Sequence, residues 1–153
     1  MIGAKILLVD DETVFTDNMS RLLNTRGYRA TAVNSGEDAV NILKGDRFDV
    51  VVLDLKMPGM DGITTLREIK TLGLFAEILI LTGHGSIDTA MEAIKLGAYD
   101  YLTKPCEIED LVAKIEGAWE KKDTAEKKDL EEKIQKVVES PSATFDLFPK
   151  TKK

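Results

Sequence analysis

The chain has 153 residues, of which 43% are hydrophobic, so it is long enough for one domain with a real core and short for two. Its net charge of −6 is uneven, because residues 1–120 carry 12 basic and 20 acidic side chains (net −8) and residues 121–153 carry 9 and 7 (net +2). The acidic body argues against direct nucleic-acid binding, and the single cysteine, Cys106, excludes an intramolecular disulfide. With no signal-peptide pattern and no apolar run near the ~18 residues of a membrane span, we expect a cytoplasmic protein without membrane insertion.

Five segments predict β-strands, over residues 4–9, 28–33, 48–53, 76–81 and 98–103. The first, third and fourth are rich in Ile, Val and Leu without alternation, which is typical of parallel strands buried on both faces. The second and fifth are weaker, and each follows a glycine.

Apolar residues at helical spacing fill the intervals, over residues 14–27, 36–45, 62–72, 87–97 and 108–119. Ser35 is the expected N-cap of the second helix, with Asp38 as a capping-box partner, and Gly27 is an expected C-terminal stop. The apolar stripe of the first helix consists of Val14, Met19, Leu22 and Leu23. Strands that alternate with helices through short connections predict a doubly wound α/β fold.

Polar side chains stand at the ends of four predicted strands, namely Asp10, Asp11, Asp54, Thr82 and Lys104. Sheets of this kind bind ligands beyond the carboxyl ends of their strands, so we expect these groups to share one rim. Each has a simpler explanation, since acids favour the start of a helix and a lone lysine is usually solvated. Their convergence favours a cation site, because adjacent carboxylates repel each other.

Four motifs resemble a known family, “DDE” (10–12), “LDLKMPGMDG” (53–62), “LTGHG” (81–85) and “YLTKP” (101–105). Residues 4–120 are similar to receiver domains of bacterial two-component response regulators, above all to receivers of the nitrogen-regulator type. The resemblance implies a flavodoxin-like strand order of 2-1-3-4-5. We expect a receiver domain over residues 1–122 and a helical or disordered C-terminal extension over 123–153.

The resemblance implies that Asp54 accepts a phosphoryl group in a Mg²⁺-dependent reaction. A carboxylate fixed at a strand end can attack phosphorus and form an acyl phosphate. Mg²⁺ prefers one or two carboxylates together with waters and phosphate oxygens. The expected metal ligands are Asp11 and Asp54, Asp10 directly or through water, and the backbone carbonyl of Lys56.

Lys104 and Thr82 are expected to complete the site, the first as a positive charge for the phosphoryl oxygens and the second as a hydroxyl donor. The resemblance also implies a cis Lys104–Pro105 bond. Tyr101 matches the switch aromatic of the family, which would move when Thr82 moves, although an aromatic on a last strand is often plain core. A packing change of this kind is a shift between two populated states.

Three positions carry weaker expectations. By resemblance, Lys56 and His84 flank the path of the hydrolytic water and would modulate the lifetime of the phosphorylated state, although His84 is also explained as an exposed loop residue. Cys106 departs from the family, where an aromatic commonly follows Lys-Pro, and is best explained as a small buried residue.

The extension carries Leu130, Ile134, Val137 and Val138 at helical spacing, and Ser140-Pro141 is the expected stop. It can extend the fifth helix, pack back or meet a partner, and we favour a mobile or partner-docking helix. The terminal Phe145, Leu147 and Phe148 form either a disordered end or a docking strip.

These features predict a stand-alone receiver that is a signalling switch and not a metabolic enzyme, with only weak self-phosphorylation from small donors and autodephosphorylation. The alternative is a receiver fragment of a larger transcriptional regulator. Expected partners are a histidine kinase or phosphotransfer protein, a downstream protein at the surface of residues 87–97, 98–103 and 108–119, and a second copy in a homodimer. A small-molecule phosphatase is disfavoured because Lys56 replaces its usual second acid, and a flavin carrier because “DDE” would repel the flavin phosphate.

Overall fold

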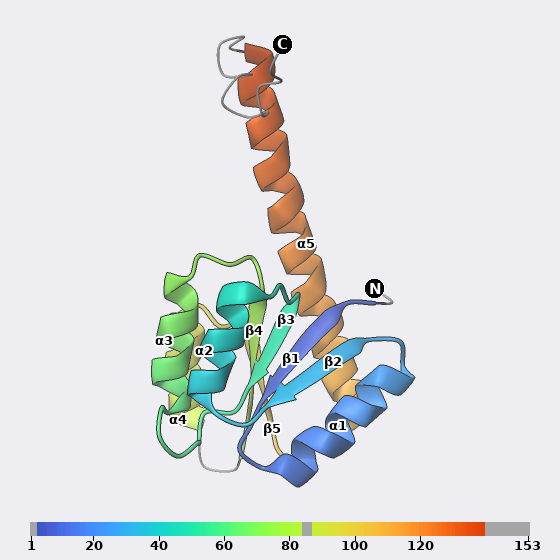
Figure 1. Ribbon diagram of the computed structural model, residues 1–153, viewed down its shortest axis with the longest axis vertical. Helices are drawn as coiled ribbons and strands as arrows, with labels where there is room; N and C mark the ends of the chain where they lie inside the picture. The colour runs from blue at the N-terminus through green and yellow to red at the C-terminus, as the bar shows by residue number, and fades with distance from the viewer. Residues whose placement is uncertain (1–2, 84–86, 140–153) are drawn as a thin grey trace. The chain divides into compact units, whose positions relative to one another are not determined.

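Five parallel strands form one sheet with helices on both faces (Figure 1). The computed structural model describes residues 3–83 and 87–139. The strands are β1 (Lys5–Val9), β2 (Arg29–Val33), β3 (Val50–Leu53), β4 (Glu77–Thr82) and β5 (Asp100–Thr103). The helices are α1 (Thr13–Thr25), α2 (Gly36–Gly45), α3 (Gly62–Thr71), α4 (Ile87–Lys95) and α5 (Ile108–Glu139). The order β2-β1-β3-β4-β5 confirms the predicted doubly wound, flavodoxin-like sheet.

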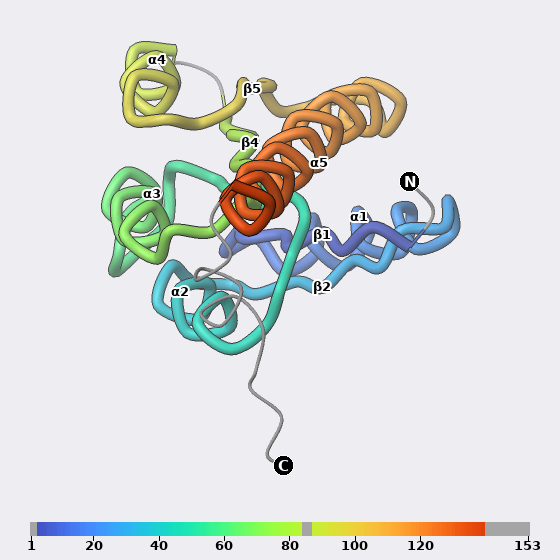
Figure 2. Tube along the Cα trace, turned by 90° about the horizontal axis from the view of Figure 1, so that it is seen from above, coloured from blue at the N-terminus to red at the C-terminus, as the bar shows by residue number. Residues whose placement is uncertain are grey.

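The central strands are buried on both sides, which explains why their sequences do not alternate. In β3, Val51 and Leu53 lie in the core under α2, α3 and α4, whereas Val50 and Val52 lie in the core under α1 and the first turns of α5 (Figure 2). All four of these side chains are at most 3% exposed. Each face of the strand removes apolar surface from water, so both faces need large aliphatic residues.

The first helix buries two of the four predicted stripe residues, Met19 and Leu23, and exposes the other two. Its buried residues are Thr16, Met19 and Leu23. Val14 is 72% and Leu22 44% exposed, so the predicted stripe was wrong at these two positions. The reason is helical geometry, because residue 14 lies about 200° around the helix axis from residue 16 and cannot share its face.

Local signals in the sequence correctly predicted two helix ends. The Ser35 hydroxyl accepts a hydrogen bond of 3.1 Å from the backbone N–H of Asp38, so Ser35 is the N-cap of α2. Gly27 follows α1 with a φ of +95°, a conformation that glycine adopts without steric cost. These caps fix where the connections leave the helices.

The chain divides into two compact units, Met1–Lys122 and Asp123–Lys153. The described part of the second unit is the last stretch of α5, which continues to Glu139. Its side chains Leu130, Ile134 and Val138 are at least half exposed. A docking role for this segment stays a prediction, and the expected features from Ser140 onward lie outside the described residues. No helix within the described ranges is both long and apolar enough to cross a bilayer.

Candidate phosphoacceptor site

Backbone hydrogen bonds beyond the strand ends bring the polar rim together. The N–H of Asp54 donates to the carbonyl of Val9 at 2.9 Å, which sets Asp54 beside the end of β1. The N–H of Lys104 donates to the carbonyl of Thr82 at 2.7 Å. The parallel ladder therefore continues for one residue past β3 and β5 and fixes the chain where the polar side chains begin.

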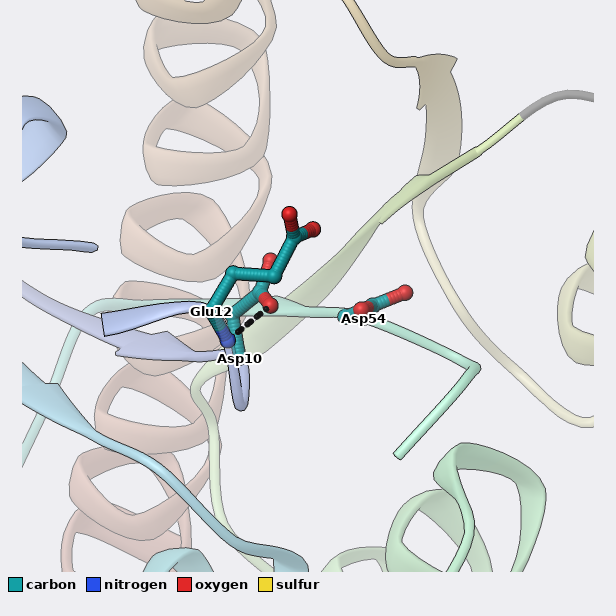
Figure 3. Close-up of side chains that lie close together, drawn as sticks. All are labelled: Asp10, Glu12 and Asp54. Atoms are coloured by element: carbon teal, nitrogen blue, oxygen red, sulfur yellow. Dashed lines mark hydrogen bonds between the residues drawn. The ribbon is translucent and has the colours of Figure 1, made fainter. Parts of the chain in front are cut away.

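Three carboxylates from two segments meet at this rim. One oxygen each of Asp10, Glu12 and Asp54 lie within 4.8 Å of one another (Figure 3). Asp10 and Asp54 are buried at 3% and 5% exposure, whereas Glu12 is exposed. Backbone donors orient two of the acids, since the N–H of Glu12 donates to Asp10 at 3.0 Å and the N–H of Lys56 to Asp54 at 3.1 Å.

Lys104 is the counter-ion of this cluster. Its ammonium donates to Asp10 and, at 2.8 Å, to Glu12, and it lies 3.6 Å from the nearer oxygen of Asp54. The same nitrogen lies 4.5 Å from the centroid of the Phe15 ring. The bond between Lys104 and Pro105 is cis, as the family resemblance implied.

The electrostatics of the site leave it short of positive charge. Burial, reinforced by the charge of Asp10, raises the pKa of Asp54 to about 6, although the Lys56 N–H and Lys104 act in the opposite direction. Burial lowers the pKa of Lys104, but its hydrogen bonds to Asp10 and Glu12 and the charge of Asp54 outweigh this effect and raise the pKa overall. The hydrogen bond and the charge of Lys104 lower the pKa of Glu12. One lysine therefore does not fully compensate three acids.

Thr82 and Tyr101 occupy β4 and β5 next to the rim. Thr82 is fully buried, and its hydroxyl has no hydrogen-bond partner among the described residues. Tyr101 is half-buried and packs against the core under α2, α3 and α4. A buried hydroxyl without a partner is uncommon in native proteins and is available to a new acceptor.

The remaining predicted site residues either do not belong to this cluster or lie outside the residues that the structure describes. Asp11 is exposed and does not belong to the group of acids found within the described residues, so its metal role stays a prediction. The Lys56 side chain is exposed, and His84 lies outside the described residues. Glu12 was missed as a site residue, although it belongs to the “DDE” run and its contact with Lys104 identifies it.

Comparison with known proteins gives the family directly. The family model for the response regulator receiver domain matches residues 6–116. The chain belongs to this family. It is 42% identical to the transcriptional regulatory protein ZraR of Escherichia coli K12 over 113 residues, which are 74% of this chain and 26% of ZraR. It is 41% identical to the transcriptional regulatory protein FixJ of Bradyrhizobium diazoefficiens over 113 residues, or 74% of this chain and 55% of FixJ.

Solved receiver structures agree with the fold. A response regulator receiver domain from Clostridium thermocellum superposes with a TM-score of 0.75 at 37% identity, covering 80% of this chain and 98% of that one. Full-length FixJ from B. japonicum superposes with a TM-score of 0.78 at 36% identity, covering 90% of this chain and 67% of that one. The chain spans about a quarter of ZraR and about half of FixJ.

The donor set of this receiver domain suits the Mg²⁺ that receivers bind at an acidic pocket. Carboxylate oxygens are the ligands that Mg²⁺ prefers, and the described residues gather three of them on one rim. The raised pKa of Asp54 is a second sign that the cluster favours further positive charge. The site therefore fits a hard divalent ion and a phosphoryl group together.

Proposed function

We propose that this receiver is a phosphoacceptor switch in which Asp54 takes a phosphoryl group from a histidine kinase or a phosphotransfer protein. The observation that carries the proposal is the placement of Asp54 at a buried strand end, 3.6 Å from the Lys104 ammonium and within 4.8 Å of two further acids. A fixed nucleophile beside a fixed positive charge is the arrangement that phosphoryl transfer needs, since this reaction depends on positioning and charge stabilisation.

In this reaction a carboxylate oxygen of Asp54 attacks phosphorus and forms an O–P bond. The P–N bond of the donor phosphohistidine breaks, and its electron pair returns to the imidazole nitrogen. Lys104 stabilises the charge on the phosphoryl oxygens, and the unpartnered Thr82 hydroxyl donates to one of them. A bound Mg²⁺ would supply further positive charge for the phosphoryl oxygens. Asp10, Asp11, Asp54 and the backbone carbonyl of Lys56 would hold it.

Phosphorylation would then change the packing at β4 and β5. Thr82 is buried and Tyr101 half-buried on neighbouring strands, where Ile80 of β4 pairs with Tyr101. Movement of Thr82 toward a phosphoryl oxygen opens space that Tyr101 can enter. The output surface would comprise α4, β5 and α5, where Ile87 and Met91 are 44% and 49% exposed.

The same site would hydrolyse its own acyl phosphate slowly, so the chain acts on itself and not on a metabolite. Lys56 and His84 would tune this hydrolysis. A downstream protein or a second copy would read the modified surface, and the acidic residues 1–122 would not contact nucleic acid directly.

A second candidate is that the chain acts as the receiver part of a longer transcriptional regulator. Two observations favour it, the names of ZraR and FixJ and the fraction of each that this chain spans. The phosphoacceptor chemistry is the same in both candidates.

The test is intact-mass measurement after incubation with phosphoramidate and Mg²⁺. Wild type is expected to gain one phosphoryl group, and Asp54→Asn none. Asp17→Asn, which removes an exposed acid from α1, is the charge-matched control and should be labelled like wild type. Equal labelling of Asp54→Asn would overturn the assignment.

A further inference from the structure

The Lys104 ammonium is held most closely by the segment that leads from β1 into α1. Glu12 lies 2.8 Å from its nitrogen, Asp10 accepts a hydrogen bond, and the Phe15 ring centroid is 4.5 Å away. Asp54 is 3.6 Å away, beyond a normal N–H···O distance. Lys104 therefore lies closer to the segment from Asp10 to Phe15 than to the proposed phosphoacceptor.

This arrangement leaves few N–H donors of Lys104 free for a phosphoryl group. An ammonium has three N–H donors, of which Asp10 and Glu12 each accept one. The Phe15 ring attracts the cation on a further side. If a bound ion engages Asp10, the closest remaining contacts of Lys104 would be those with Glu12 and Phe15, with Asp54 farther away at 3.6 Å.

We propose that Glu12 and Phe15 form a resting dock for Lys104, which Lys104 must leave to reach a phosphoryl group on Asp54. The proposal rests on the proposed function of Asp54. Glu12 is a positioning residue that acts through Lys104. The dock slows phosphorylation, because Lys104 must break its interactions with Glu12 and Phe15 before it can stabilise the phosphoryl oxygens.

The dock also affects the metal-free site. Glu12 shares the Lys104 ammonium with Asp10, so Asp10 is less strongly neutralised by this lysine and stays more attractive to a cation. Without Glu12, Lys104 pairs with Asp10 alone and competes more strongly with Mg²⁺. Glu12 therefore favours Mg²⁺ binding through the same lysine by which it restrains phosphorylation.

The first experiment measures the phosphorylation rate with phosphoramidate at saturating Mg²⁺, followed by intact mass. Glu12→Gln removes the charged contact and is expected to raise the rate about threefold, the usual scale of an exposed ion pair. Glu12→Asp keeps the charge but shortens the side chain, so it should also be faster than wild type. Asp17→Asn, the charge-matched control on α1, should not change the rate.

Two results would overturn the dock in this experiment. One is a Glu12→Gln rate equal to that of Asp17→Asn. The other is acceleration by Glu12→Gln without acceleration by Glu12→Asp, which would assign the effect to net charge. Phe15→Leu keeps an apolar side chain without the ring and should also accelerate the reaction, and an unchanged rate would remove Phe15 from the dock.

The second experiment needs no phosphodonor. Calorimetry measures Mg²⁺ affinity for wild type, Glu12→Gln, Lys104→Met and the double variant. Glu12→Gln is expected to weaken Mg²⁺ binding about threefold when Lys104 is present and clearly less when Met replaces it. Equal weakening in both backgrounds would show that Glu12 does not act through Lys104.

The two experiments separate the failure of the dock from the failure of the proposed function. If wild type gains no phosphoryl group, the role of Asp54 is wrong, and the calorimetric cycle still decides whether Glu12 acts through Lys104. If wild type is phosphorylated and the cycle shows no coupling, only the dock is wrong.

Discussion

The Lys104 ammonium lies 3.6 Å from the Asp54 carboxylate, so the proposed phosphoacceptor and its expected cationic partner are already neighbours before any phosphoryl group arrives. Both side chains are largely buried, with 15% and 6% of their surfaces exposed. Removal of Lys104 therefore leaves carboxylate charge that water cannot fully screen, whereas Lys104 keeps Asp10 and Glu12 as partners when Asp54 is removed. This relationship, and the packing around it, lead to predictions for stability and for the switch.

Lys104→Met should destabilise the metal-free protein by about 2 kcal/mol, because Asp10 and Asp54 lose their shared counter-ion in a buried site. Urea unfolding in EDTA measures the change, and saturating Mg²⁺ should recover most of it. Lys127→Met is the control, since Lys127 is exposed and its pair with Asp123, 3.0 Å away on the same helix, contributes at most about 0.5 kcal/mol. Equal losses for the two variants would contradict the role of Lys104 as counter-ion.

Asp54→Asn should stabilise the metal-free protein at neutral pH. Burial raises the pKa of Asp54 from 3.8 to about 6, so between these values the folded state binds more protons than the unfolded state. The free energy of unfolding of wild type therefore falls as pH rises through this window. The free energy of unfolding of Asp54→Asn should not show this fall, because Asn does not titrate.

The difference between the two proteins should grow from about 0.5 kcal/mol at pH 4 to about 3 kcal/mol at pH 7.5 in EDTA. Urea unfolding at these two pH values measures it. A difference that does not depend on pH would show that the Asp54 charge is not destabilising.

Thr82→Val should leave the unmodified protein as stable as wild type or stabilise it by about 1 kcal/mol, because the buried hydroxyl has no partner among the described residues. The same variant should lose the phosphorylation-dependent chemical-shift change at Tyr101, measured by NMR. Thr65→Val is the matched control.

The Thr65 hydroxyl is equally buried but donates to the carbonyl of Asp61 at 2.7 Å, so its loss should destabilise the protein by about 1 kcal/mol. If Thr82→Val destabilises the protein as much as Thr65→Val, the Thr82 hydroxyl has a partner in solution and is not free for a phosphoryl oxygen.

Gly36→Ala should destabilise the protein by about 2 kcal/mol, because a Cβ there would lie 2.1 Å from the Thr65 hydroxyl oxygen and 3.0 Å from the carbonyl oxygen of Met60. Thermal unfolding measures the change. Gly45→Ala at the other end of α2 has open space around its Cβ and should be neutral or slightly stabilising. Similar effects of the two substitutions would show that α2 and α3 can separate easily.

Much of the architecture could be predicted from the sequence, because helix ends depend on local residues and central strands need apolar residues on both faces. The non-alternating runs at β1, β3 and β4 predicted strands covered on both faces, and the burial of every residue of β3, alternately in the two cores, confirms this. The stripe of α1 was partly wrong because Val14 and Leu22 are apolar but exposed. Apolar residues can occupy a surface at little cost, so apolarity alone did not identify the inward face.

The sequence by itself determined which polar residues end the strands, because the carboxyl ends of parallel strands must share one edge. Tertiary structure alone decided the partners on that edge. Lys104 donates to Asp10 and Glu12, and its ammonium lies over the ring of Phe15 in α1. The length of the side chains and the packing of α1 set these distances. Periodicity specifies which side of an element a residue faces, whereas contacts between residues about 90 positions apart arise only when the sheet and its helices are packed together.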